Sequence, residues 1–170
     1  MTRGFIFFLI VALLAGVAMW GYIGADGQSS VLEYLRLKRP PAAVRVRVAD
    51  VSLGGVTVRT DVAETAADRE RGLAGRLALE ELEGMLFLFD TSAPHAFWMK
   101  GMKMPIDIIW IDDGKIVDIA ADVPPSSDVS PPLYTPSRPA NRVLEVSAGF
   151  AKRHGLIVGT PVTIRFDGFR

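Results

Sequence analysis

Twenty consecutive uncharged residues, Gly4–Ile23, separate an apolar N-terminal segment from the rest of this chain. A helix of that length spans about 30 Å, the thickness of the hydrocarbon core of a bilayer. Trp20 and Tyr22 lie near its far end, where aromatic side chains favour the headgroup region. We therefore expect a transmembrane anchor at 4–23. Cleavage as a signal peptide is the alternative, because Phe5–Val17 also has the composition of a hydrophobic signal core.

The charges that flank this segment bear on its orientation in the membrane. Arg3 on one side is outnumbered by Arg36, Lys38 and Arg39 on the other, and that count opposes export. A short N-terminal flank, residues 1–3, before a long apolar run is nevertheless typical of an export signal-anchor. We expect a single-pass inner-membrane protein whose C-terminal domain is periplasmic or otherwise extracytoplasmic. Secretion after signal-peptide cleavage is the alternative.

The remaining sequence divides into a linker at 24–43 and a single domain at 44–170. Ser30–Glu33 is a capping box that starts a short helix, and Pro40-Pro41 ends it. The domain is long enough to bury a core of its own.

Short apolar or alternating segments predict a mainly β domain of the α+β class. The Asp113-Gly114 pair is typical of a tight hairpin, because both residues tolerate positive φ. Hairpins imply antiparallel pairing, so we expect an antiparallel β-sandwich or a partly closed barrel with two or three short helices. The expected strands are 44–48, 56–62, 84–90, 97–100, 105–111, 115–119, 142–146 and 160–166, and the expected helices start at Thr65, Arg76 and Ser147.

Composition excludes several classes of function. Lys and Arg number 19 and so do Asp and Glu, which leaves no basic excess for a nucleic-acid partner. The absence of cysteine excludes disulfides, thiol catalysis and zinc-cysteine sites. With two histidines, the chain cannot build a His-rich metal site.

The sequence also carries no recognisable catalytic motif. It lacks a Gly-x-Ser-x-Gly elbow, a Walker loop and a dinucleotide-binding fingerprint. The acidic residues Glu80, Glu81 and Glu83 are interpreted as a solvated turn, and His154 as the end of a helix. We therefore assign no catalytic residue, and an uncharacterised enzyme is kept only as an alternative.

Three polar residues interrupt apolar strands: Lys100, Asp107 and Glu145. A buried carboxylate needs a partner, so one interpretation is an ion pair in which Lys100 or Arg71 neutralises Asp107 or Glu145. The other is a cleft with a polar floor and aromatic walls, closed by the proline-rich loop 121–140. The candidate ligand-binding residues are Trp98, Lys100, Asp107, Tyr134, Glu145 and Arg71.

A metal site is an alternative in the same region. His95, Met99, Met102 and Met104 lie within ten residues of one another, and thioether ligands suit Cu(I). The competing interpretation is that these methionines fill the core. No cofactor is otherwise expected.

The order of several motifs resembles the domain-of-unknown-function family 192 (DUF192). They are Arg69–Leu73, Gly84–Phe89, Phe97–Lys100, Pro105–Asp112, Val143–Gly149 and the closing segment Gly155–Val162. The resemblance covers about Val56–Ile164. It implies a compact, mainly β domain, commonly after a signal or anchor segment, and no established reaction. Gly101-Met102 stand where the family usually has Asn-Thr.

These observations predict an accessory domain, anchored to the membrane through residues 4–23 or exported. We expect it to bind a small molecule, an envelope component or a partner protein. The alternatives are a periplasmic Cu(I)-binding protein, an uncharacterised enzyme and a purely structural domain.

Overall fold

A computed structural model describes residues 46–170, which fall within one unit of the chain, Arg45–Arg170. The predicted anchor at 4–23 and the predicted linker at 24–43 both lie outside the described residues. Among the described helices, none is long and apolar enough to cross a bilayer.

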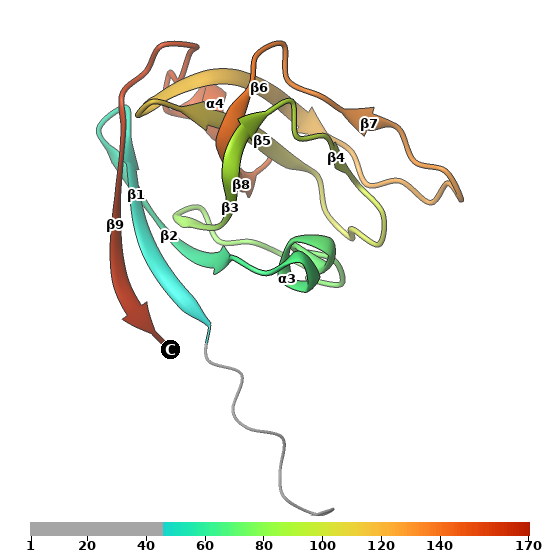
Figure 1. Cartoon of the computed structure of the whole chain (residues 1–170). Coiled ribbons are helices and arrows are strands. Elements are labelled where there is room, and N and C mark those ends of the chain that lie inside the picture. The colour runs from blue at the N-terminus through green and yellow to red at the C-terminus, as the bar shows by residue number, and fades with distance from the viewer. Residues whose placement is uncertain (1–45) are drawn as a thin grey trace, which may run out of the picture. The chain divides into compact units, whose positions relative to one another are not determined.

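Seven strands form one mixed sheet in the order β6-β5-β8-β3-β2-β1-β9, and two short strands, β4 and β7, pair separately. Figure 1 shows this sheet with α3 and α4 beside it. The prediction of a mainly β domain is confirmed. The elements are β1 Arg47–Leu53, β2 Val56–Ala63, α3 Ala66–Arg71, β3 Glu83–Ala93, β4 Phe97–Trp98, β5 Ile106–Asp112, β6 Lys115–Val123, β7 Leu133–Tyr134, β8 Ala140–Ser147, α4 Phe150–Arg153 and β9 Val162–Phe169.

Purely antiparallel pairing is the part of the prediction that is wrong. β2 and β3 pair in parallel, with Asp61 opposite Met85. The connection 64–82 between them contains α3 and is long enough to return the chain in the same direction, which a hairpin cannot do. The other neighbouring strands of the large sheet pair antiparallel.

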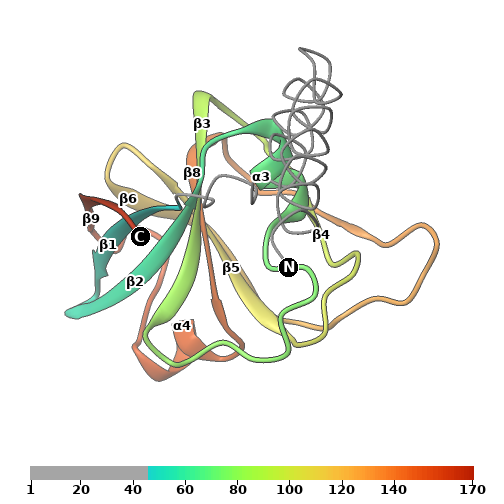
Figure 2. The same ribbon diagram turned by 90° about the horizontal axis from the view of Figure 1, so that it is seen from below.

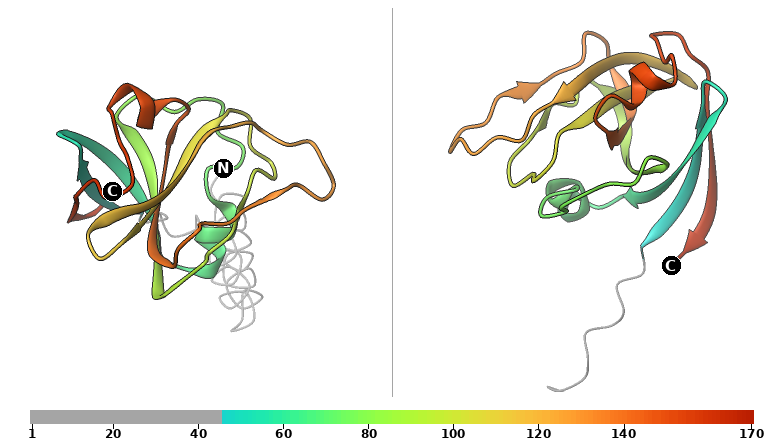
Figure 3. Two further views of the ribbon diagram at one scale, coloured as in Figure 1. Left: turned by 90° about the horizontal axis from the view of Figure 1, so that it is seen from above. Right: turned by 180° about the vertical axis from the view of Figure 1, so that it is seen from behind.

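The sheet curls until its two edge strands meet at one end (Figure 3). A bridge joins Lys115 at the start of β6 to Pro161 just before β9. The Val162 amide donates to the Gly114 carbonyl oxygen (2.8 Å), and the Ile116 amide donates to the Thr160 carbonyl oxygen (3.0 Å). These contacts are confined to the beginnings of the two strands, so no closed barrel forms among the described residues.

Each face of the sheet packs against its own apolar cluster. The inner cluster includes Leu86, Ile109, Leu144 and Phe150, and α4 contributes to it. The segment after α3 contributes Leu73 to the opposite cluster. This cluster also includes Phe87, Trp110, Val143, Met99, Met102 and Met104. Because β5 is buried on both faces, its sequence is almost continuously apolar rather than alternating.

The two helices match their predicted positions unequally. α3 begins after Thr65, whose Oγ1 accepts a hydrogen bond from the Asp68 amide (3.1 Å), and ends at Gly72 with φ 47°, as predicted. The second expected helix, from Arg76, is absent from the described structure. α4 begins after Gly149 and has no side-chain cap of its own, so the prediction of Ser147 as its cap is wrong.

The sequence predicted the conformation of the β5–β6 loop better than that of the proline-rich connection. Asp113 and Gly114 have φ 46° and 64°, which confirms the predicted hairpin between β5 and β6. The proline-rich connection 121–140 contains too many prolines for a long ladder, because proline has no amide hydrogen to donate. It nevertheless pairs for two residues, Leu133 and Tyr134 of β7, with Trp98 and Phe97 of β4.

Candidate functional site

A cleft of about 370 Å³ opens on the side of the sheet that carries α3 and β4. Figure 2 shows α3 and β4 next to each other. β3 contributes Phe87 and Phe89 to the wall of the cleft. The turn after α3 supplies Leu73, and β4 supplies Phe97. The complete lining is Arg69, Glu70, Arg71, Gly72, Leu73, Ala74, Phe87, Phe89, Ala96, Phe97, Trp98, Lys100, Met102, Leu133 and Glu145.

Glu145 is the one acidic residue of this lining that is buried, with 5 % of its surface exposed. It lies in the middle of β8, between Met85 of β3 and Ile108 of β5 in the register of the sheet. Side chains alternate along a strand, so Glu145 shares a face with Val143. Apolar neighbours therefore surround its carboxyl group.

The Glu145 carboxyl group has an unusual electrostatic environment. Its Oε2 is buried and has no hydrogen-bond partner among the described residues. Burial raises the pKa of Glu145 to about 8, because the charged form is disfavoured away from water. The group is therefore mostly uncharged at neutral pH, and it can both donate and accept a hydrogen bond.

Three of the other predicted ligand-binding residues lie at the mouth of this cleft. Trp98 is 45 % exposed, and the Lys100 Nζ lies 5.8 Å from the centroid of its ring. Arg71 forms an ion pair with Asp68 of the same helix. The structure thus brings Trp98, Lys100, Arg71 and Glu145 to one cleft.

Asp107 does not belong to this cleft. It points from β5 to the opposite face of the sheet and is fully buried. Its Oδ1 accepts hydrogen bonds from the amides of Asp122 (2.8 Å) and Gly149 (2.9 Å), and its Oδ2 accepts one from Ala151 (2.8 Å). Asp107 thereby satisfies the start of α4, the helix that lacks a cap of its own.

The predicted ion pair between strands is not what the structure contains. Among the described residues, no ion pair joins Lys100 or Arg71 to Asp107 or Glu145; backbone amides satisfy Asp107, and Glu145 has no cationic partner. The buried carboxylate that does form ion pairs is Asp61, with Arg76 and Arg170. Sequence reasoning did not identify that set.

Tyr134 also lies apart from the cleft. It lines a separate hollow of about 320 Å³ with Trp110 and Asp118. Its neighbour Leu133 is the residue of β7 that reaches the cleft, opposite Trp98 in the two-residue ladder. The proline-rich connection therefore contributes to the cleft through a different residue from the one predicted.

The methionines proposed as copper ligands pack in the core. Met99, Met102 and Met104 are all buried in the cluster that includes Phe87. The Met102 amide donates to the Met99 carbonyl oxygen (3.3 Å) across a turn in which Gly101 has φ 75°. The ring of His95 instead stacks on Phe89 with a centroid separation of 3.6 Å, and its Nε2 lies 3.0 Å from the Thr91 carbonyl oxygen. In residues 46–170, no group of three His, Asp or Glu side chains is arranged to hold a metal ion.

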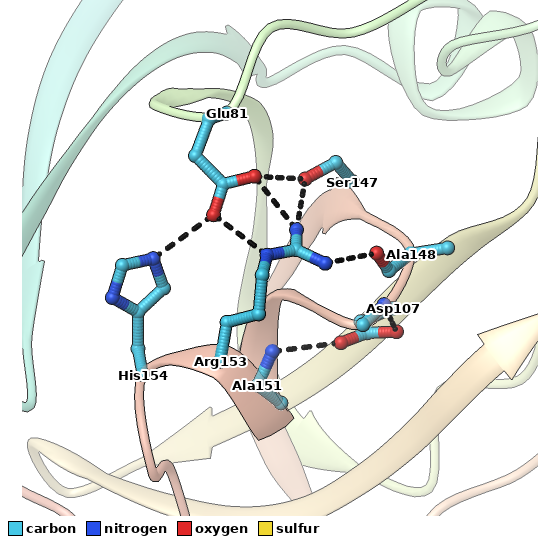
Figure 4. Close-up of polar contacts among 8 residues, drawn as sticks. Glu81, Asp107, Ser147, Ala148, Ala151, Arg153 and His154 are labelled. Atoms are coloured by element: carbon cyan, nitrogen blue, oxygen red, sulfur yellow. Dashed lines mark hydrogen bonds and ion pairs between the residues drawn. The ribbon is translucent and has the colours of Figure 1, made fainter.

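Sequence reasoning missed a surface cluster that ties the loop before β3 to α4 (Figure 4). The Glu81 carboxylate accepts hydrogen bonds from Arg153 Nε (3.0 Å) and Nη2 (2.7 Å) and from His154 Nε2 (3.0 Å). The hydrogen bonds from Arg153 are the main reason that the pKa of Glu81 falls to about 2. Ser147 Oγ also donates to Glu81 (3.3 Å). We call Glu81, Ser147, Arg153 and His154 the Glu81 clasp.

The Glu81 clasp contains a serine, a histidine and a carboxylate but lacks the geometry of a catalytic triad. In a triad, the histidine contacts the serine and the carboxylate orients the histidine. Here Ser147 and His154 both bind Glu81, and no hydrogen bond joins them among the described residues. The clasp fixes the loop that continues from the cleft wall at Leu73.

Comparison with known proteins adds a family but no activity. The DUF192 family model, described as an uncharacterized ACR, matches residues 48–164. The search of curated proteins found no match. A crystal structure of a protein of unknown function from Novosphingobium aromaticivorans is 30 % identical, with a TM-score of 0.62 over 73 % of this chain and 89 % of that one.

A second solved structure is similar to the same extent. It is that of a candidate transcription regulator from Sinorhizobium meliloti, 30 % identical, with a TM-score of 0.60 over 74 % of this chain and 94 % of that one. The family model covers most of the described domain, and its match agrees with the resemblance found in the sequence motifs. This chain therefore belongs to the DUF192 family.

Proposed function

We propose that this domain binds a small organic molecule in the cleft floored by Glu145. The observation that carries the proposal is the unpartnered Oε2 of Glu145 beneath aromatic walls. Native proteins satisfy nearly all buried polar groups, because each unmade hydrogen bond costs about 1–3 kcal/mol. A buried carboxyl at the base of an open cleft is the arrangement expected when a ligand supplies the missing partner.

The contrast with the other buried acids supports this role over a structural one. Asp107 accepts three backbone hydrogen bonds, and Asp61 has two arginine partners. Both stabilise the fold in the absence of any ligand. Burial of Glu145 is unfavourable, and no hydrogen bond to its Oε2 or ion pair offsets that cost among the described residues. Its position is therefore better explained by a ligand that binds in the cleft.

We further propose that the domain works at a membrane surface, held there by residues 4–23. The support is the uncharged length of that segment and the aromatic residues at its far end. Full-length protein should remain in the membrane fraction through an alkaline carbonate wash. A chain beginning at Val44 should be recovered in the soluble fraction, and release of a shortened form from cells would show cleavage instead.

Methyl NMR of the full-length protein in a non-ionic detergent tests the binding role. Met102 lines the cleft, so its methyl signal reports a ligand there and is assigned by its loss in Met102→Leu. A set of neutral, anionic and cationic ring compounds should contain members that shift this signal saturably. Compounds that hydrogen-bond to the floor should bind more weakly to Glu145→Leu.

Two controls separate loss of the site from loss of the fold. Leu has nearly the volume of Glu and suits the apolar surroundings of position 145, so that variant should fold. Glu80→Gln removes a carboxylate from an exposed position and should leave every titration unchanged. If no compound moves the Met102 signal, or if Glu145→Leu binds all of them as wild type does, the proposed site is wrong.

A further inference from the structure

The mouth of the Glu145 cleft is electropositive. Arg69 lies there with its guanidinium 5.1 Å from the centroid of the Phe89 ring, and its hydrogen bonds go to the neutral carbonyl oxygens of Glu64 and Leu88. Its positive charge is therefore not cancelled by those partners. Lys100 adds a second cation beside Trp98, and it has no ion-pair partner among the described residues.

The remaining charges of the mouth reduce this field without reversing it. Arg71 is offset by its ion pair with Asp68, and Glu70 contributes one negative charge. Because Glu145 is mostly uncharged at neutral pH, it does not offset the two cations. A ligand that enters the cleft therefore meets a positive rim first.

The walls between rim and floor are aromatic. Phe97 lies edge-on to Phe87, with ring centroids 4.9 Å apart, and edge-on to Phe89 at 6.3 Å. Trp98 and Leu133 extend the apolar surface outward, and Leu133 is 61 % exposed. Flat apolar groups gain both burial and edge-to-face contacts against such walls.

The floor selects an uncharged polar group. An un-ionised carboxyl offers an O–H donor and a carbonyl acceptor side by side, which suits a hydroxyl, carbonyl or amide. A cationic amine would instead require Glu145 to ionise in apolar surroundings and would have to pass Arg69 and Lys100. The rim and the floor thus favour the same orientation of a ligand.

We infer that the cleft takes an aromatic acid, with its anionic group at the Lys100 rim, its ring against Phe87 and Phe97, and an uncharged polar substituent on Glu145. This inference rests on the proposed function and deepens it by naming the ligand class. The two ends of the ligand would contact different residues, Lys100 and Glu145, and each residue can be substituted separately.

Three related probes test the assignment: 3-(4-hydroxyphenyl)propionate, 3-phenylpropionate and tyramine. The first carries both the anion and the hydroxyl, the second lacks the hydroxyl, and the third replaces the anion with an amine. Each is titrated at pH 6.5 into full-length protein in a non-ionic detergent, and dissociation constants are taken from the Met102 methyl signal. We expect the hydroxylated acid to bind about fivefold more tightly than phenylpropionate and at least about tenfold more tightly than tyramine.

Matched variants assign each preference to its residue. Lys100→Gln should weaken both acids about threefold, whereas Lys103→Gln, an exposed lysine outside this cleft, should not. Glu145→Leu should abolish the preference for the hydroxylated acid over phenylpropionate. Binding of both acids should also weaken as salt is added.

The outcomes distinguish this inference from the proposed function. Tyramine binding as tightly as the acids, or more tightly as the pH rises past 8, would overturn the ligand class and leave a cation-binding cleft. Failure of all three probes to move the Met102 signal would overturn the aromatic-acid assignment. If the broader compound set also fails to move that signal, the proposed function fails with it.

Discussion

Two acidic residues are buried on opposite faces of the same sheet, and their surroundings differ completely. Asp107 of β5 accepts hydrogen bonds from three backbone amides and holds the start of α4. Glu145 of β8, the neighbouring strand, has an unpartnered oxygen and lies beneath a cleft. Both carboxyl groups are buried, so their exposure does not distinguish them. The number of hydrogen-bond partners does: it separates a carboxyl that stabilises the fold from one that is free to bind a ligand.

The largest expected effect of a substitution falls on the satisfied acid. Asp107→Ala leaves three backbone amides of 122, 149 and 151 without acceptors, so we expect a loss of about 3–5 kcal/mol in the free energy of unfolding. Urea denaturation at pH 7 measures it. A change below about 0.5 kcal/mol would show that these amides find other partners and would remove the contrast with Glu145.

The unsatisfied acid should behave in the opposite way, and its effect should depend on pH. The folded-state pKa of Glu145, about 8, lies above the usual 4.5, so the folded protein keeps a proton that the unfolded chain releases between pH 4.5 and 8. Wild-type stability from this group therefore falls as the pH rises through that window. Glu145→Gln, which cannot ionise, should gain about 2–4 kcal/mol relative to wild type between pH 5 and pH 8.5.

The comparison that tests this effect is the difference between variant and wild type, because it cancels the other titrating groups. Glu80→Gln is the matched control and should show no such trend. A Glu145→Gln difference that stays constant across the window would mean that Glu145 is already ionised in the folded protein.

The Glu81 clasp should give a smaller effect with the opposite dependence on pH. The folded-state pKa of Glu81, about 2, lies below the usual 4.5. The contribution of Glu81 to the stability of the fold is therefore present above pH 4.5 and is lost as the pH falls through 2. Glu81→Gln should lower the urea midpoint at pH 6, and the gap from wild type should narrow toward pH 2. Glu83→Gln, also on the exposed surface, is the control; an equal gap at both pH values would contradict the assignment.

The smallest effect on stability is expected at the mouth of the cleft. Lys100 is exposed, and its contact with the Trp98 ring is a long one, so Lys100→Gln should change the free energy of unfolding by less than about 0.5 kcal/mol. Its effect should appear in anion binding instead. A large loss of stability in urea denaturation would place Lys100 in the scaffold.

The sequence predicted the elements better than their arrangement. The hairpin at Asp113-Gly114 and the α3 cap at Thr65 are local, and short-range backbone preferences specify them. The parallel pairing of β2 with β3 depends on how the segment 64–82 packs, which no local pattern encodes. The Glu81 clasp likewise joins Glu81 to Arg153 and His154, which follow it in the chain by 72 and 73 positions.

The candidate site was predictable in part for a related reason. Glu145 and Asp107 were both recognisable as polar residues in apolar strands. Their faces were not, because β5 and β8 are buried on both sides and apolar residues flank each acid on either face. The sequence of these strands does not alternate between apolar and polar residues, so it does not indicate which face of the sheet each acid lies on. The two acids were therefore expected at one site instead of two.

The pKa of Glu145 in the ligand-free, full-length protein is the most direct test of whether this carboxyl is buried without a partner. The side-chain carboxyl carbon can be followed by NMR from pH 4 to pH 9.5, with Glu145→Gln used to assign the signal. We predict a midpoint near pH 8, together with a shift of that midpoint when the hydroxylated aromatic acid occupies the cleft. A midpoint near 4.5, unchanged by any ligand, would show a solvated or satisfied carboxylate and would contradict the role assigned to this cleft.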